Sequence, residues 1–232
     1  MWALRRAAHH PTTLAVVSEG LTSGASAAPP EHHTAGGAAT SGTSSALARL
    51  TSKSLALRAL RAFERRTDLY YLRLAYGHSA FGDGCEVRFG HHFIVSRGAE
   101  MRFGDGCIID RGMTVEVSGR LEVGARTIFG HHCTVAARSA VSIGANCLIA
   151  ELVSIRDHDH GFTRLDVPTR DQGAIVADVV VGSNVWLGSK VTVLKGVTIG
   201  NNAVIGAGAV VSTDIPENAV ALGVPARVVR YR

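Results

Sequence analysis

The chain has 232 residues, of which 46% are hydrophobic, only 6% are aromatic and 26 are glycine. Such a composition predicts a core of small and β-branched side chains and disfavours a packed helical bundle. The net charge of +5 lies in residues 1–66, which carry eight basic and three acidic side chains, whereas residues 67–232 carry sixteen of each. The charge is therefore no indication that residues 67–232 bind nucleic acid.

Residues 1–43 are rich in Ala, Ser, Thr, Gly, Pro and His and show no periodic apolar pattern, which is typical of a disordered leader. Arg5 and Arg6 precede a short apolar stretch at residues 14–17. That stretch is about half the length of a secretory h-region, so export and organelle transit are the less favoured interpretations. No apolar run reaches the roughly 18–20 residues that a membrane-spanning helix needs.

Residues 44–80 are predicted to form an amphipathic helical segment. Leu47, Leu50 and Leu60 recur near helical spacing, with Arg58 and Arg61 between them. Such a segment most often caps the open end of a repeat domain, and a basic helix lying on a membrane surface is the alternative.

Residues 81–216 form a repeat. Each unit opens with an aliphatic or aromatic residue followed by glycine, and these lead residues are Phe81, Phe103, Val123, Ile143, Val181 and Ile199. Within the units a six-residue period is visible, and three hexads account for the 18-residue interval from Val181 to Ile199. The first intervals are two to four residues longer, and the interval of 38 residues contains one insertion of about twenty.

Each six-residue side predicts a short strand and a turn, with the lead residue pointing inward and its glycine permitting the corner. Three sides close a triangular coil, and one coil cannot bury its own face, so about six coils stack into an all-β parallel β-helix. The four cysteines, Cys85, Cys107, Cys133 and Cys147, occupy an inward slot for small side chains. They are therefore predicted to be buried, reduced thiols, which suits the cytoplasm. We predict no metal site, because no C-x-x-C pair is present.

Three segments resemble the hexapeptide-repeat O-acetyltransferases, a family that includes maltose, galactoside, xenobiotic and polysaccharide-modifying enzymes. They are Asn184-Val-Trp-Leu-Gly188, the run Val204–Val211 and Gly223-Val-Pro-Ala226. The resemblance covers residues 80–232. It implies a left-handed coil, a homotrimer with sites between subunits, and acetyl-CoA as the acyl donor.

The insertion, expected to project as a loop over residues 157–178, opens with Ile155-Arg-Asp-His158-Asp-His160-Gly161. Long loops in a regular repeat are usually functional. Acyl transfer to an alcohol needs a base near neutral pH, which histidine supplies, and a neighbouring acid can orient its ring. The resemblance favours His158 as the catalytic base with His160 in reserve, and Asp157 or Glu151 as the orienting acid.

The same resemblance implies the positions of further site residues. The oxyanion donor is expected at Gly188 and Ser189, and coenzyme A is expected along the last coils near Ala207, Thr213, Arg227 and Arg230. Trp186 is expected to form a wall of the acceptor or pantetheine channel. His132 stands where the sugar acetyltransferases place an amide, so their mode of hydroxyl recognition does not transfer directly.

The sequence thus predicts an acetyl-CoA-dependent O-acetyltransferase that transfers the acetyl group directly to a sugar or glycan hydroxyl. N-acylation of an amino-sugar or amino acid, with acetyl or succinyl, is the first alternative. The Phe-Gly-His-His quartets at 89–92 and 129–132 suggest a second alternative, a zinc enzyme similar to the γ-carbonic anhydrases. The third histidine of those enzymes is missing here. A non-catalytic β-helix scaffold is the third alternative. Residues 217–232 are expected to form a C-terminal tail.

Overall fold

The computed structural model describes residues 69–77 and 80–232. The leader and most of the predicted helical segment, with their basic side chains, lie outside the described residues. Residues 69–76 are helical, and the guanidinium of Arg73 donates to the backbone oxygens of Phe81 and Gly82 at 3.0 and 2.7 Å. None of the helices in the described ranges has the length and apolar character that crossing a bilayer would require.

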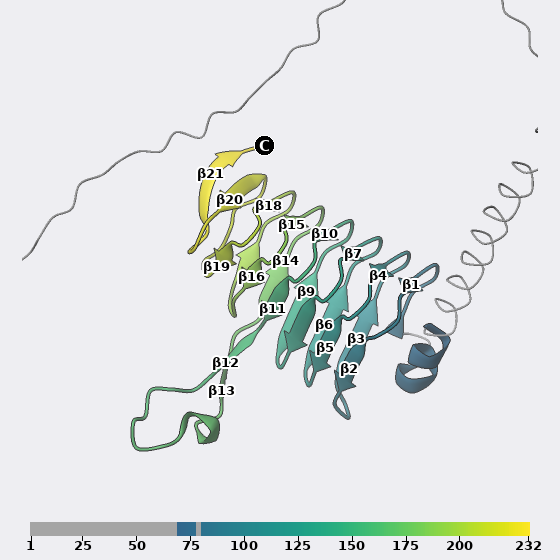
Figure 1. Cartoon of the computed structure of the whole chain (residues 1–232), viewed down its shortest axis with the longest axis horizontal. Coiled ribbons are helices and arrows are strands. Elements are labelled where there is room, and N and C mark those ends of the chain that lie inside the picture. The colour runs from purple at the N-terminus through teal and green to yellow at the C-terminus, as the bar shows by residue number, and fades with distance from the viewer. Residues whose placement is uncertain (1–68, 78–79) are drawn as a thin grey trace, which may run out of the picture. The chain divides into compact units, whose positions relative to one another are not determined.

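From Phe81 onward the chain winds through stacked three-sided coils, and each of the first five gives one strand to each of three sheets (Figure 1). The first sheet contains β1 (Glu86–Val87), β4 (Ile108–Ile109), β7 (Ile128–Phe129), β10 (Leu148–Ile149), β15 (Trp186–Leu187), β18 (Val204–Ile205), β20 (Ala219–Leu222) and β21 (Arg227–Tyr231). The second contains β2 (His92–Val95), β5 (Thr114–Val117), β8 (Thr134–Ala137), β11 (Ser154–Arg156), β16 (Thr192–Val193) and β19 (Val210–Val211). The third contains β3 (Glu100–Phe103), β6 (Arg120–Val123), β9 (Ala140–Ile143), β14 (Val179–Val181) and β17 (Thr198–Ile199).

Neighbouring coils pair in parallel and in register, as a stacked repeat requires. Val123 pairs with Phe103 and Ile143, and Ile143 pairs with Val181 across the insertion. The predicted parallel β-helix is therefore confirmed. It has about seven turns rather than six, because Ile199 also bridges Ile215 and β20 continues the first sheet beyond β18. The antiparallel strand β21 then covers the last edge.

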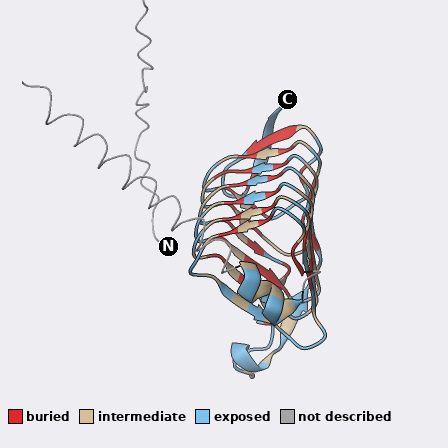
Figure 2. Cartoon of the chain, turned by 90° about the vertical axis from the view of Figure 1, so that its right-hand side faces the viewer, coloured by how far each residue is buried: buried red, intermediate tan, exposed pale blue. Residues whose placement is uncertain are grey.

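The inside of the coils is the hydrophobic core, as Figure 2 shows by the buried segments that line each turn. All six predicted lead residues are buried, and the rings of Phe81 and Phe103 stack with centroids 5.2 Å apart. The four cysteines are free and buried, as predicted. Three of them, with Thr127, form one column: Cys85, Cys107, Thr127 and Cys147 follow one another on successive coils.

The glycines beside the lead residues were predicted to permit the corner, but the structure gives a different reason for them. Gly124 and Gly144 do not adopt positive φ, so they are not needed for the corner itself. A Cβ on Gly124 would lie 2.4 Å from the backbone nitrogen of Ala145, and one on Gly144 would lie 2.5 Å from that of Ser183. Glycine is therefore required by the close approach of the next coil. The left-handed corner conformation falls two residues later, for example at Asn146 and Asn184.

Candidate active site

The insertion is an antiparallel hairpin, β12 (His158–His160) with β13 (Ala174–Val176), tipped by a 3-10 turn, η2 (Thr169–Asp171). It leaves the coil after β11 and projects away from the stack (Figure 1). We call residues 157–178 the arm. The backbone of Asp157 closes its base, accepting a hydrogen bond from Ala177 N–H at 2.8 Å.

Asp157 lies at the root of the arm and is completely buried. Its Oδ1 accepts the backbone N–H of Arg138 at 2.9 Å and its Oδ2 accepts that of Ser139 at 2.6 Å. Oδ1 also lies 2.9 Å from Nδ1 of His158. A carboxylate that accepts two backbone N–H groups is held in place, so it can orient the imidazole beside it.

Two further contacts attach the arm to the coils on either side. The hydroxyl of Ser139 donates to Oδ1 of Asp178 at 2.6 Å, so the turn after β8 binds both ends of the arm. On the following coil, Nζ of Lys195 lies 2.7 Å from Oδ2 of Asp159. Sequence reasoning missed Ser139 and Lys195. Their signal is positional, because Ala136 pairs with Arg156 and so the next residues of both coils meet at the same corner.

His158 and His160 alternate with Asp159 along β12 and therefore share one face of the hairpin. The side chain of His158 is 19% exposed, while His160 is exposed and its side chain makes no hydrogen bond within the described residues. His158 also lines a groove of about 330 Å³ that continues along the coils preceding the arm. Of the two histidines, His158 alone combines a carboxylate partner with a lined groove among the described residues.

Glu151 lies at a different corner, in the turn between β10 and β11. Its own backbone N–H, the Ser189 hydroxyl and the nearby positive side chains hold the pKa of this carboxyl below its usual range. The structure thus brings Glu151 to the predicted oxyanion segment and brings Asp157 to His158.

The same corner gathers four of the other predicted residues on successive coils, namely Gly188, Ser189, Ala207 and His132. Gly208 N–H donates to Ser189 at 2.8 Å, and a Cβ on Gly188 would lie 2.7 Å from the nitrogen of Ala207. His132 lies at this corner on an earlier coil and has a positive φ of 57°. Thr213 instead follows β19 and lies beyond the end of the second sheet.

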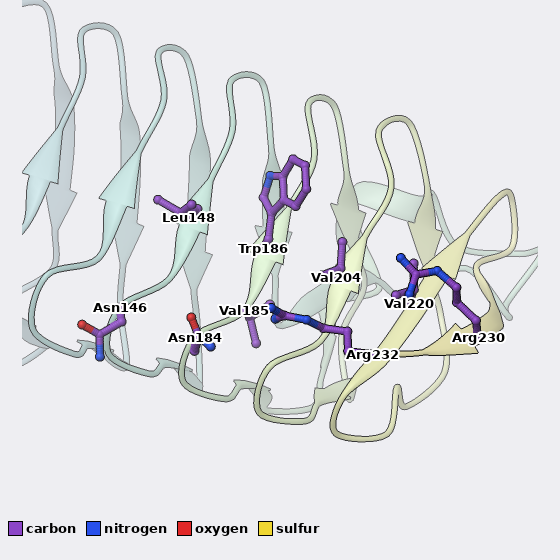
Figure 3. Close-up of a pocket in the computed structure, with 9 residues that line it drawn as sticks. All are labelled: Asn146, Leu148, Asn184, Val185, Trp186, Val204, Val220, Arg230 and Arg232. Carbon is purple, nitrogen blue, oxygen red and sulfur yellow. The ribbon is translucent and has the colours of Figure 1, made fainter. Parts of the chain in front are cut away.

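Trp186 projects from the outward face of β15 and is 53% exposed. Figure 3 shows it on one side of a pocket of about 340 Å³, with Arg230 and Arg232 reaching over the first sheet from β21 and the C-terminus. Arg227 does not line this pocket; its guanidinium donates to the Ala226 carbonyl. The sequence placed Trp186 in a wall of the acceptor or pantetheine channel and Arg230 near the cofactor. It did not indicate Asn146 and Asn184, which also line the pocket.

The two Phe-Gly-His-His quartets do not stack. Val87 aligns with Ile109 and Ile109 with Phe129, so the coil offset is 42 residues rather than 40. Phe89 is consequently 59% exposed while Phe129 is buried. His91 falls into the inward slot, where it packs against Phe93 with ring centroids 5.6 Å apart. The hypothesis of stacked zinc-binding histidines is wrong in its register, and residues 69–77 and 80–232 contain no group of three candidate ligands.

A family model described as "Bacterial transferase hexapeptide (six repeats)" matches residues 178–213. These residues form the regular coils from β14 to β19. The repeat domain is a hexapeptide-repeat β-helix.

A curated protein of Mycobacterium tuberculosis, named "Probable acetyltransferase Rv3034c", is 38% identical to the hexapeptide-repeat chain over 85 residues. This match covers 37% of the chain and 28% of that relative, so it spans little more than a quarter of the relative's length. Among solved structures, a variant of the N-acyltransferase AntD from Bacillus cereus, in complex with dTDP and coenzyme A, is 15% identical with a TM-score of 0.58. The match covers 66% of this chain and 83% of the AntD chain, and the two are similar in fold. A galactoside acetyltransferase in complex with coenzyme A is 30% identical with a TM-score of 0.45, over 66% of this chain and 64% of that one.

Within one copy of the hexapeptide-repeat chain, the predicted site residues lie in separate places. Asp157 and His158 are at the corner from which the arm leaves, whereas Gly188 and Ser189 are at the corner between the first and second sheets. Trp186 lies on the outward face of the first sheet. A single chain therefore holds the predicted base and the predicted oxyanion donors on different edges of the coil.

Proposed function

We propose that the protein is an acetyl-CoA-dependent O-acetyltransferase that acts on a hydroxyl of a sugar or glycan-like acceptor. The observation that carries the proposal is the hydrogen bond between His158 and the buried carboxylate of Asp157, at the root of the arm and beside a groove. The similarity to a curated acetyltransferase and the hexapeptide repeat support the reaction class.

The geometry around His158 supports a base mechanism. Because Nδ1 faces the Asp157 carboxylate at 2.9 Å, Nδ1 carries the proton and Nε2 has the free lone pair. Nε2 removes the hydroxyl proton as the acceptor oxygen attacks the thioester carbonyl, and Asp157 stabilises the resulting imidazolium. The tetrahedral intermediate then expels the coenzyme A thiolate, which takes the proton back from His158. The acetyl group passes directly to the acceptor without a covalent enzyme intermediate.

The proposed donor site uses main-chain groups and cations. Gly188 and Ser189 supply N–H donors to the oxyanion, and the absence of a side chain at Gly188 lets the carbonyl approach closely. Arg230 and Arg232 lie beside Trp186 in one pocket, where guanidinium groups suit the phosphates of coenzyme A. Ala207, Thr213 and Arg227 complete the proposed cofactor contacts along the last coils. His132 and Trp186 are the proposed acceptor contacts.

A complete site needs two copies of the chain, because the base and the oxyanion donors lie on different edges of one protomer. We place the site between neighbouring subunits of a homotrimer, in which each copy gives its arm corner to one neighbour and its opposite corner to the other. Such head-to-tail contacts close into a ring. We also propose a cytoplasmic location, which suits the four unpaired thiols.

N-acylation of an amine with acetyl or succinyl is the alternative reaction. It would use the same base and donor site. The product distinguishes the two reactions, since an amide resists mild alkaline hydroxylamine whereas an ester is cleaved. A scaffold would bind no acetyl-CoA.

The experiment is a screen of sugar, glycan and amine acceptors that follows thiol release from acetyl-CoA. His158→Ala is expected to lower turnover by about 10²–10⁴-fold, the range of general-base catalysis. His160→Ala, on the same face of the arm, is the matched control and should retain most of the activity. If His158→Ala kept full turnover and His160→Ala were inactive, the base would be His160 and not His158. If the protein bound no acetyl-CoA, the proposal would be wrong.

A further inference from the structure

The groove beside His158 runs along four successive turns of the chain. Its lining residues are Ile94 and Ser96 at the end of β2, Glu116, Val117 and Ser118 at the end of β5, Ala137 and Arg138 at the end of β8, and His158 on the arm. Val95, Val117 and Ala137 pair in register, so the lining follows the stacking direction. Three steps between neighbouring coils, each about 4.8 Å, give a length of about 14 Å. That length exceeds one pyranose ring.

The side chains of the groove suit hydroxyl groups. Glu116 is an exposed carboxylate and Arg138 an exposed guanidinium, and neither forms an ion pair within residues 69–77 and 80–232. A carboxylate accepts and a guanidinium donates paired hydrogen bonds, as the vicinal hydroxyls of a sugar require. Ile94, 48% exposed, offers an apolar surface at the far end for the C–H face of a sugar ring.

The backbone along the groove is already paired. The N–H groups of β2, β5 and β8 donate to the next coil, as in His92 to Met113 and Thr114 to Cys133. An extended peptide binds mainly through main-chain hydrogen bonds at a free strand edge. This groove has side chains to offer instead, which favours a glycan over a peptide.

We infer that the acceptor is an oligosaccharide of at least two or three sugar units, whose reacting unit lies at His158 and whose further units lie over Glu116 and Ile94. This inference rests on the proposed function, because it takes His158 as the reacting end. Arg138 then determines specificity close to the reacting unit, Glu116 determines it at the next unit, and Ile94 adds affinity only for longer chains.

The test uses the full chain on a glycan array that carries matched series of one to four sugar units, neutral and anionic, together with control peptides. At least one series should show binding that rises about tenfold or more from one unit to three. Glu116→Ala should reduce this rise about tenfold, and Ile94→Ser should reduce only the gain from the last unit. The matched control is Glu100→Ala, an exposed carboxylate that lies on the third sheet and pairs with Arg120.

His158→Ala should keep the length-dependent binding, since it changes only the end of the groove at the reacting unit and leaves Glu116 and Ile94 in place. Binding that does not depend on length in any series, no binding to any glycan, or binding to the peptides would overturn the inference. Acetyl transfer to short acceptors would survive each of these results, whereas a failure of the proposed function would appear as no thiol release and no acetyl-CoA binding.

Discussion

The imidazole of His158 and the carboxylate of Asp157 are adjacent in sequence, yet the two side chains meet because backbone N–H groups of the coil below hold the carboxylate. Nδ1 lies 2.9 Å from Oδ1, and the N–H groups of Arg138 and Ser139 occupy the same carboxylate at 2.9 and 2.6 Å. The orientation of the His158 imidazole therefore depends on a turn that is 18 residues earlier in the chain.

Asp157→Asn should lower kcat by about 10²-fold or more, because an amide has one acceptor oxygen and cannot satisfy both N–H groups and the imidazole. The unsatisfied donor should also cost about 1–3 kcal/mol of unfolding free energy. Steady-state kinetics and urea unfolding measure the two effects. Asp171→Asn, at the exposed tip of the arm, is the control and should change neither. Unchanged kcat in Asp157→Asn would contradict an orienting role for this carboxylate.

Two inactive variants, His158→Ala and Trp186→Ala, should restore activity when they are mixed, unfolded and refolded together. In a closed ring with sites between neighbours, random mixing at equal ratio leaves about a quarter of the sites with both intact residues. The specific activity should thus recover to about a quarter of the wild-type value, with the assembly size confirmed by light scattering. Recovery near zero, with mixed assemblies formed, would place both residues in one protomer's site.

Stability should depend on pH through His91. Burial lowers the pKa of His91 to about 4, and the nearby Asp110 offsets this only in part. In the unfolded chain the pKa is about 6.5, so the unfolded state binds more protons between these values. The free energy of unfolding should therefore be constant above about pH 6.5 and fall towards pH 4, by about 2 kcal/mol after allowance for partial exposure.

The control for His91 comes from the next coil, where Met113 occupies the equivalent inward slot. His91→Met should remove most of the pH dependence between about pH 6.5 and 4, as measured by urea unfolding at a series of pH values. An unchanged slope in this variant would show that other groups cause the acid sensitivity.

Gly124→Ala should destabilise the repeat domain by about 2–3 kcal/mol, because the added Cβ would lie 2.4 Å from the backbone of the next coil. Gly208→Asn is the contrasting change. A Cβ at Gly208 meets nothing within 4 Å, and its φ of 71° is close to that of His132, Leu152 and Lys190 at the equivalent corners. Gly208→Asn should stay within about 1 kcal/mol of the wild type. Similar unfolding curves for both variants would refute the close-stacking explanation.

The local repeat predicted much of this architecture. A six-residue period with inward lead residues allows only a coil that closes on itself and stacks, so the core residues Phe81, Val123 and Ile199 and the buried cysteines could be read directly. The insertion was equally visible, since a departure of about twenty residues breaks an otherwise regular period.

The register between coils could not be read so reliably, because it depends on how many residues each corner takes up. The first coil is two residues longer than the second, which moves His91 into the core and separates the two histidine quartets. The choice between Asp157 and Glu151 was open for the same reason: which acid contacts His158 is decided by the corner that each one reaches.

The sequence by itself determined the repeating coil, its inward side chains and the presence of an arm with titratable side chains, because all three follow from short-range periodicity. Only the tertiary structure decided that the turn at Arg138 and Ser139 binds Asp157, that His158 and the Gly188–Ser189 segment lie on separate edges, and that a groove extends from His158 to Ile94. These relationships join residues on different coils, and hydrogen bonding and packing between stacked coils bring such residues together.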